Sequence, residues 1–271
     1  MPATPPLQRG AMVKNPSPAE FAEQPDSARR FSGLDRLYGA GPAQAVRGAH
    51  VVVVGVGGVG SWAAEALARS GIGRITLIDM DHVSESNINR QVHALTPTLG
   101  MSKINAMAQR IALINPDCQV VGVDDFVDAS NWLSLAPFDA DAVIDACDQV
   151  NAKAAMAHWA LSTKTLFVSV GAAGGKRHAQ AVNILDLSAC THDPLLAQVR
   201  YRLRKFHQAP KEGRNIGVAC VSSPEPVVSA QAQGDSTLNC HGYGSLVTVT
   251  ATFGLCAAGW VIDKLSLRAS V

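Results

Sequence analysis

The chain has 271 residues, of which 47% are hydrophobic, and a formal net charge of +1 at pH 7. This size and composition suit one α/β domain with an appendage, and the near-neutral charge excludes a protein that is basic over its whole surface. Six cysteines without a C-x-x-C pair argue against a zinc ribbon and against a disulfide scaffold. Because the N-terminus has no apolar signal core, the sequence predicts a cytoplasmic protein.

The first residues differ in composition from the rest. Residues 1–28 hold six of the 14 prolines and show no apolar period, so we expect a disordered tail there and a folded unit over 29–271. Residues 29–39 mix arginines with apolar side chains. They form either a solvated helix or a segment whose arginine, Arg30 or Arg36, reaches a phosphate site in the same chain or across a dimer.

Residues 51–60 organise the chain. Four successive valines at 51–54 predict a strand that is buried on both faces, as in a parallel sheet. Glycines at the G-x-G-x-x-G spacing follow, and residues 61–70 have helical composition; the glycines of this turn are Gly55, Gly57, Gly58 and Gly60. Strand, turn and helix together predict a phosphate site, because glycine lets the backbone approach an anion at the helix N-terminus.

A second predicted strand, 75–78, ends at Asp79. A carboxylate at this position meets a ribose hydroxyl in dinucleotide-binding units, so the glycines and Asp79 alone leave an NAD site open. The next loop is polar and holds Asn87, Asn89 and Arg90. Arginine forks around phosphate oxygens and amides bond phosphate or ribose, whereas NAD binding has no evident need for this cluster.

Lys103 begins a predicted helix that runs to residue 114 and is stopped by Pro116. A surface lysine is the usual outcome for such a position, but its place beside the polar loop favours a phosphate ligand. Residues 119–123 and 142–148 are read as further strands, the second ending at Asp148. A carboxylate at the carboxyl end of a strand, facing a triphosphate, is a natural magnesium ligand; Asp145 is the weaker candidate because it lies inside the apolar run.

The alternation of strands and helices continues through a helix at 152–161 and a strand at 165–170, followed by a glycine-rich loop. It predicts a Rossmann-like, mostly parallel α/β sheet with helices on both faces. We place the nucleotide-binding core at about 48–175 and a substrate or dimer extension at about 176–271.

The extension has three distinctive stretches. Residues 200–214 are rich in cations interleaved with two aromatics, and they predict either a solvated helix face or a contact to the backbone of a nucleic acid; the cations are Arg200, Arg202, Arg204, Lys205, Lys211 and Arg214. Residues 215–242 are polar and indicate a mobile loop with Cys220 and Cys240. Residues 245–262 are apolar, which favours a core or dimer-interface helix and leaves peripheral membrane association open.

Taken together, these motifs resemble the ubiquitin-activating-type superfamily of adenylating enzymes. The matching segments are Gly55–Gly60, Asp79-Met80-Asp81, Ser86–Gln91, Lys103 and Asp148. The longer segments GVGGVGSWAAEALARSGIG, LIDMDHVSESNINRQVHAL, VDDFV and VTVTATFG are similar to bacterial members that dehydrate threonylcarbamoyladenosine in tRNA. The resemblance covers residue 30 to the C-terminus.

The resemblance implies a homodimer that uses ATP and Mg²⁺ to form an acyl-adenylate on a tRNA-bound carboxylate. It further implies that Gly55 to Gly60, Asp79 and Asp81 bind the nucleotide, that Ser86, Asn87, Asn89, Arg90 and Lys103 hold phosphates, and that Asp148 holds magnesium. Either Arg36 or Arg30 would reach the partner's ATP, and Cys240 is a remote candidate for an acyl-accepting thiol. Sulfur-acceptor proteins of a cysteine-desulfurase system are possible partners.

Three other functions compete with this one. Adenylation of a small sulfur-carrier protein is disfavoured because related enzymes commonly hold zinc with two C-x-x-C pairs, which this chain lacks. A NAD-dependent oxidoreductase is disfavoured by the cluster of amides and cations. A scaffold that only binds a partner is disfavoured by the complete set of ligand residues.

Overall fold

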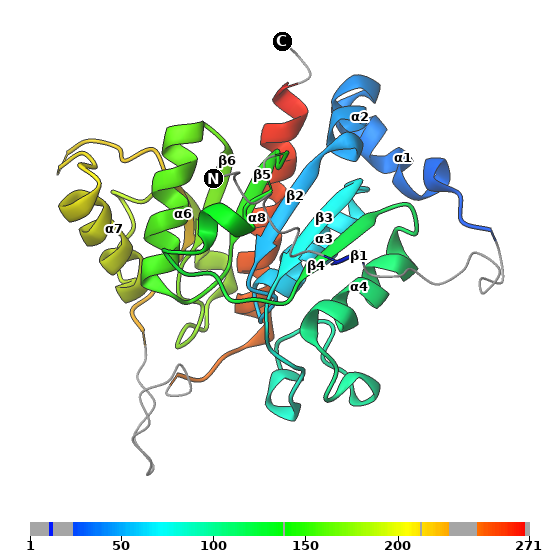
Figure 1. The fold of residues 1–271 in the computed structure, drawn as a ribbon, viewed down its shortest axis with the longest axis horizontal. Coiled ribbons are helices and arrows are strands. Elements are labelled where there is room, and N and C mark those ends of the chain that lie inside the picture. Colours follow the sequence, from blue (N-terminus) through cyan, green and yellow to red (C-terminus); the bar gives the residue numbers. More distant parts are fainter. Residues whose placement is uncertain (1–10, 13–23, 138, 212, 228–242, 269–271) are drawn as a thin grey trace, which may run out of the picture.

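The computed structural model describes residues 11–12, 24–137, 139–211, 213–227 and 243–268. A sheet of eight strands runs through the centre of the molecule in the order β1-β4-β3-β2-β5-β6-β8-β7 (Figure 1). The inner strands are parallel, and the edge strands β1 and β7 are antiparallel to their neighbours. The strands are β1 (Ala11–Met12), β2 (His50–Val54), β3 (Arg74–Ile78), β4 (Gln119–Val123), β5 (Ala142–Asp145), β6 (Leu166–Val170), β7 (Asn183–Asp186) and β8 (Ala219–Ser222).

Register brings the ends of the central strands level with one another. Val54 of β2 pairs with Ile78 of β3 on one side and with Asp145 of β5 on the other. The residues that follow these three strands therefore leave the sheet at the same edge. This edge is where ligands bind in open α/β sheets.

Helices cover both faces of the sheet (Figure 1). One face carries α3 (Gly60–Arg69), α4 (Lys103–Ile114) and α8 (Val247–Arg268), and the other carries α5 (Trp132–Leu135), α6 (Val150–Thr163) and α7 (Pro194–Phe206). The remaining helices are α1 (Ser27–Tyr38) and α2 (Ala40–Gly48), and the short 3-10 helices η2 (Glu85–Asn87), η3 (Thr96–Thr98) and η4 (Ala179–Ala181). The predicted fold class is thus confirmed.

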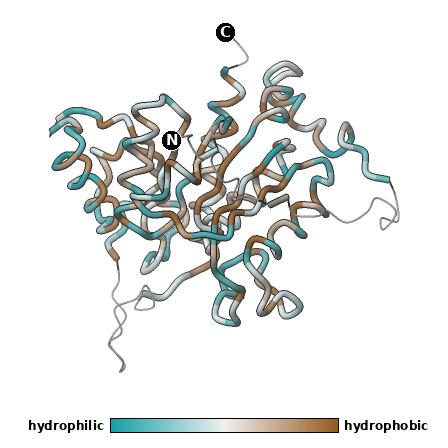
Figure 2. The backbone as a smooth tube through the Cα atoms, viewed as in Figure 1, coloured by the Kyte–Doolittle hydropathy of each residue, from teal (hydrophilic) through white to brown (hydrophobic). Residues whose placement is uncertain are grey.

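The valines of β2 show why the sheet needs two layers of helices. Val51 and Val53 belong to the hydrophobic cluster on the α3 face, whereas Val52 and Val54 belong to the cluster on the α6 face. All four are at most 2% exposed, and each contributes about 1.5–3 kcal/mol relative to an exposed valine. Hydrophobic residues accordingly concentrate along the central strands (Figure 2).

Helix α8 packs directly against the start of α3. A Cβ atom at Gly254 would overlap the carbonyl oxygen of Val59 and lie 2.9 Å from the backbone nitrogen of Ala63. Only glycine allows this approach, which places α8 against the glycine turn. Most of the apolar stretch 245–262, from Val247 on, therefore belongs to a core helix, and no helix within the described residues is long and apolar enough to cross a membrane.

Three expectations differ from the structure. Within the expected disordered tail 1–28, Ala11–Met12 pairs with β4 and α1 begins at Ser27; residues 1–10 and 13–23 lie outside the described residues. Strand β5 ends at Asp145 and not at Asp148, because the chain turns away from the sheet after the last ladder pair. Strand β8 lies inside the expected mobile loop 215–242, so Cys220 is a buried sheet residue and not a loop cysteine.

Candidate nucleotide site

The glycine turn joins β2 to α3, and two of its glycines leave no space for a side chain. Gly55 has a φ of 84°, and a Cβ atom there would lie 3.0 Å from the backbone of Ala146 and Cys147. A Cβ atom at Gly60 would overlap the Gly55 carbonyl oxygen. Gly57, by contrast, has nothing within 4 Å of a built Cβ atom. The turn is therefore packed tightly against the backbone at Gly55 and Gly60 and is open at Gly57.

Asp79, directly after β3, ties its strand to the glycine turn. Its Oδ2 accepts the backbone N–H of Val56 at 2.6 Å, and its Oδ1 accepts that of Asp81 at 2.8 Å. Burial raises the pKa of the Asp79 carboxyl above its usual value, although the Lys103 ammonium 3.8 Å away opposes this shift. The predicted ribose ligand thus also holds the turn in place.

Lys103 is the first residue of α4, where the helix dipole disfavours a cation. Two carboxylates offset this: Lys103 Nζ lies 2.6 Å from Asp81 Oδ2 and 3.8 Å from Asp79 Oδ1. The Lys103 backbone also donates to the Asp81 carbonyl oxygen at 2.9 Å. The side chain is only 8% exposed, so Lys103 is not an ordinary surface lysine. It is held at the edge of the sheet where β2, β3 and β5 end, which we call the nucleotide edge.

Arg90 lies over the glycine turn. A Cβ atom at Gly58 would be 3.1 Å from Arg90 Cγ, so the stem of the arginine crosses the space that glycine leaves. Its guanidinium donates to the Ser86 carbonyl oxygen at 2.7 Å and to Asn89 Oδ1 at 3.0 Å. Trp62 of α3 donates its indole N–H to the Arg90 carbonyl oxygen at 2.9 Å. No sequence pattern indicates this role for Trp62 beyond its helical position.

The two predicted asparagines do different things. Asn87 is 8% exposed and its Oδ1 accepts the backbone N–H of Ser84, so it caps η2. Asn89 is exposed and donates to the Ser245 carbonyl oxygen ahead of α8 at 3.2 Å. Ser86 is also exposed, with its hydroxyl 2.9 Å from that of Ser84. Of these three, Ser86 and Asn89 are accessible to a ligand, and Asn87 shapes the loop.

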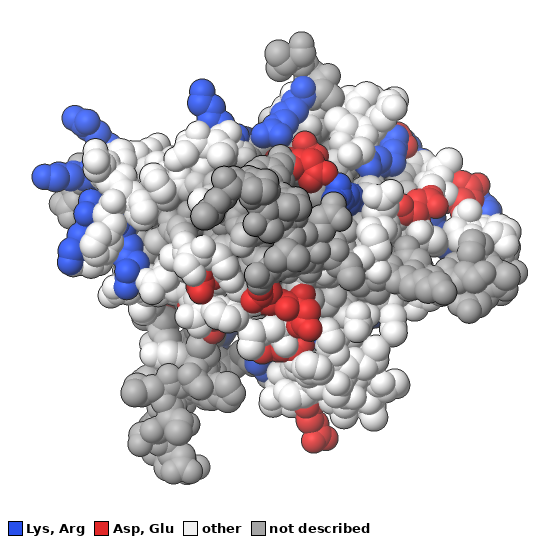
Figure 3. All heavy atoms as spheres, viewed as in Figure 1, with Lys and Arg blue, Asp and Glu red and all other residues white. Residues whose placement is uncertain are grey.

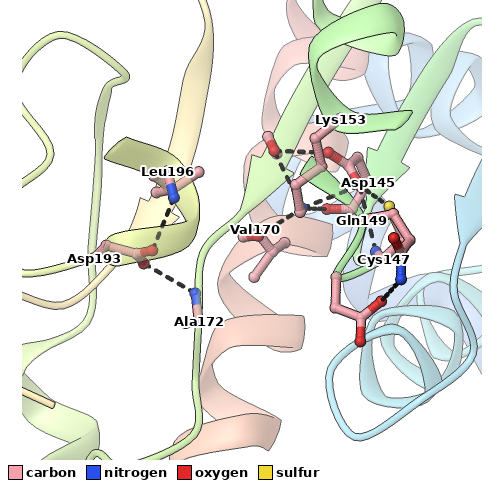
Figure 4. Close-up of polar contacts among 10 residues, drawn as sticks. Asp145, Cys147, Gln149, Lys153, Val170, Ala172, Asp193 and Leu196 are labelled. Atoms are coloured by element: carbon pink, nitrogen blue, oxygen red, sulfur yellow. Dashed lines mark hydrogen bonds and ion pairs between the residues drawn. The ribbon is translucent and has the colours of Figure 1, made fainter. Parts of the chain in front are cut away.

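Asp148 follows β5 at the same edge of the sheet and is exposed. Gln149 donates to its Oδ1 at 3.3 Å (Figure 4). Asp145, the weaker metal candidate, is fully buried and bonded to Lys153, Ser169 and Cys147, so it cannot contact a bound metal without losing these partners.

Lys153 was not identified from the sequence, although a signal was present. It is a lone cation in the alanine-rich start of α6, where burial would require an acidic partner. Asp145, inside an apolar strand, is the matching acid.

The other predicted residues that the structure describes lie away from this edge. Arg36 is exposed on α1, where it donates to the Ser32 hydroxyl, and Arg30 donates to the carbonyl oxygens of Leu113 and Ile114 at the end of α4. Cys240 lies outside the described residues. In the basic stretch, Arg200 and Arg204 donate to backbone carbonyls, whereas Lys205, Lys211 and Arg214 are exposed and Arg202 is half-buried.

Fold and site together define a Rossmann-like α/β nucleotide-binding protein whose glycine turn is accompanied by an arginine, a lysine and strand-end carboxylates. The sequence profile described as "ThiF family" matches residues 32–270. The chain therefore belongs to the ThiF family, which confirms the superfamily resemblance.

Individual relatives agree with this assignment. The chain is 43% identical over 250 residues to the tRNA threonylcarbamoyladenosine dehydratase of Haemophilus influenzae, which covers 89% of this chain and 95% of the relative. The crystal structures of the Escherichia coli tRNA N6-threonylcarbamoyladenosine dehydratase in complex with ATP and with AMP match with TM-scores of 0.82 and 0.83. Each is 43% identical and covers 90% of this chain and 96% of the other.

Proposed function

We propose that this protein catalyses the ATP-dependent, cyclising dehydration of threonylcarbamoyladenosine in tRNA. The observation that carries this proposal is the similarity to named dehydratases over nearly the whole chain, at 43% identity. The residues at the nucleotide edge support it, because the glycine turn, Asp79, Arg90, Lys103 and Asp148 occur together in one place.

ATP fits the arrangement as a substrate. The open space above Gly57 leaves room for phosphates beside the helix N-terminus, and Arg90 and Lys103 supply positive charge there. Asp79 and Asp81 would contact the ribose side. Arg90 is held by backbone and amide oxygens and is not neutralised by a carboxylate among the described residues.

Mg²⁺ fits only together with the nucleotide. Within the described ranges, no group of three or more His, Cys, Asp or Glu side chains could hold a metal ion alone. Mg²⁺ usually takes one or two carboxylates and completes its shell with substrate phosphates and water. Asp148, exposed beside the glycine turn, would be such a carboxylate, and the ion would neutralise charge on the phosphates.

The reaction balances without a further reactant. The threonyl carboxylate attacks the α-phosphorus of ATP, which forms an acyl-adenylate and releases pyrophosphate. The tethered carbamoyl nitrogen then attacks the acyl carbon, loses its proton and expels AMP, so the nucleoside loses one water overall. Tethering makes this second step effectively unimolecular, and no enzyme thiol is needed.

The tRNA contact that we propose lies on α7 and the segment after it. Lysine and arginine side chains gather on the left of Figure 3, over this helix. Lys205, Lys211 and Arg214 are exposed there, and Lys205 Nζ lies 5.4 Å from the ring of Tyr201, which is 54% exposed. Exposed cations bind phosphates and an exposed ring can stack on a base.

We further propose a homodimer in which Arg36 reaches the partner's ATP. Helices α1 and α2 precede β2, whereas the glycine turn follows it, so Arg36 and the turn of the same chain lie at opposite ends of this strand (Figure 1). Arg36 is exposed on α1. A partner subunit can therefore use it where the chain's own site cannot.

The test is a reaction of the purified protein with ATP, Mg²⁺ and threonylcarbamoylated tRNA. We expect AMP, pyrophosphate and a nucleoside that is about 18 Da lighter by mass spectrometry, because one water is lost. Asp148→Ala should abolish pyrophosphate release, and Asp263→Ala, an exposed carboxylate on α8, should not. An unchanged nucleoside mass, with AMP formed only after a sulfur-carrier protein is added, would favour adenylation of that protein instead.

A further inference from the structure

A charged pair that the proposed reaction does not use lies next to the Asp148 loop (Figure 4). Asp145 is the last residue of β5, Lys153 lies near the start of α6, and both are 0% exposed. Lys153 Nζ is 3.1 Å from Asp145 Oδ1. Apolar side chains of similar volume are often at least as stabilising as such a pair, so stability alone does not account for it.

The contacts of the pair go to the end of β6 and to the loop that follows β5. Asp145 Oδ1 accepts the backbone N–H and the thiol of Cys147, at 3.3 and 3.1 Å, and Oδ2 accepts the Ser169 hydroxyl at 2.7 Å. Lys153 donates to the carbonyl oxygen of Val170, the last residue of β6, at 2.7 Å. The pair thereby joins the end of β5, the end of β6 and the first residues of the loop 146–149.

The other side of this loop rests on the glycine turn. Ala146 donates its N–H to the Val54 carbonyl oxygen at 2.8 Å. A Cβ atom at Gly55 would lie 3.0 Å from the carbonyl group of Ala146 and from the nitrogen of Cys147. Residues 146 and 147 are thus fixed between the glycine turn and the buried pair, and Asp148 comes directly after them.

We propose that Asp145 and Lys153 are positioning residues. They hold the loop 146–149 in the conformation that lets the Asp148 carboxylate contact a magnesium ion bound to the phosphates of ATP. This inference rests on the proposed function. Groups that orient a metal ligand without touching the metal typically change metal affinity or activity by about 10- to 100-fold when they are removed.

The test measures ATP binding to the full-length protein by calorimetry, with and without Mg²⁺. We expect Asp145→Asn and Lys153→Met each to raise the Mg²⁺ concentration for half-maximal ATP binding by about 10- to 100-fold, with ATP binding in EDTA unchanged. The double variant D145N/K153M leaves no unpaired charge, so it should regain thermal stability and keep the raised Mg²⁺ requirement. Ser169→Ala, which keeps both charges, should give a smaller shift in the same direction even where the charged variants fail to fold.

Glu65 offers a matched control on α3. It is also a buried carboxylate, 4% exposed, and pairs with Arg69 and Arg110 at 2.8 and 2.6 Å. Glu65→Gln should lower the melting temperature and leave the Mg²⁺ dependence unchanged. Wild-type Mg²⁺ dependence in the double variant, or an equal shift in Glu65→Gln, would overturn the inference. A wild-type protein that binds no ATP would instead overturn the proposed function.

Discussion

At Gly58, one added methyl group should lower the activity of the protein without lowering its stability. The atoms that a Cβ would meet, Arg90 Cγ at 3.1 Å and Cδ at 3.2 Å, belong to a flexible side chain and not to backbone. The fold can therefore absorb the change only by moving Arg90.

For Gly58→Ala we expect at least about a tenfold loss of pyrophosphate release, because displacing a phosphate-binding arginine removes charge stabilisation, with little change in melting temperature. Gly48→Ala, at the end of α2 with nothing within 4 Å of its Cβ, serves as the control for an added methyl group. Full activity of Gly58→Ala would remove Arg90 from its assigned place.

His93 is a residue whose protonation should destabilise the fold. It is 1% exposed, and neither ring nitrogen has a hydrogen-bond partner among the described residues. Burial lowers the pKa of His93 to about 4 from 6.5, with the Lys103 and Arg110 cations adding to this shift. Because the folded pKa is lower, the unfolded chain binds this proton at higher pH than the folded one.

The stability linked to His93 is thus complete above pH 6.5 and is lost as the pH falls toward 4. The free energy of unfolding should drop by about 2 kcal/mol at about pH 5 relative to about pH 8. His93→Leu should flatten this part of the curve in urea denaturation at several pH values. Parallel curves for the two proteins would contradict the assignment.

At the scale of single elements, α7 combines a fixed inner side with a basic outer side. Its N-cap Asp193 accepts the N–H of Leu196 at 3.0 Å and that of Ala172, in the loop after β6, at 2.9 Å (Figure 4). A Cβ atom at Gly171 would overlap the Asp193 carboxylate. The helix that we propose as the tRNA contact is therefore attached to the loop next to the nucleotide edge.

The triple variant Lys205→Ala, Lys211→Ala, Arg214→Ala should weaken tRNA binding at low salt and reduce the slope of log affinity against log salt by roughly one for each lost phosphate contact. Filter binding over a range of salt concentrations measures both quantities. Lys264→Ala on α8 controls for a lost cation elsewhere. An unchanged slope would exclude this face as the contact.

The elements that the sequence predicted well are those with strong local patterns. Strand β4 and helix α4 have the expected bounds, and β2, β3 and β6 differ by one residue, because buried parallel strands and glycine turns leave clear sequence signals. Strand β8 was missed because its partners β6 and β7 are distant in sequence, and because the polar stretch that follows it, rich in Gly, Ser and Pro, dominates the composition of residues 215–242. The Asp145–Lys153 pair was missed for a related reason. An aspartate and a lysine are common residues, and only their burial in the folded structure shows that they form a pair.

At the scale of the whole molecule, the dimer proposal predicts complementation between inactive subunits. If Arg36 acts in the partner's site, Arg36→Ala and Lys103→Ala are each inactive, but a mixed dimer holds one site with both residues intact. After subunits exchange at random, activity should reach about a quarter of the wild-type value. Activity assays of the mixture measure this, and no recovery would place Arg36 outside the partner's site.

Gly254 of α8 packs closely against Val59 in the glycine turn. The order in which the chain is synthesised therefore affects when this turn becomes stable. The turn is translated early, but α8, the helix that supports it, is translated only after all the strands of the sheet. A nascent chain that lacks this segment exposes the apolar side of α3 and has an unsupported turn. We therefore expect the growing polypeptide to gain its affinity for ATP only after α8 has left the ribosome, which would keep shorter nascent chains from binding the nucleotide.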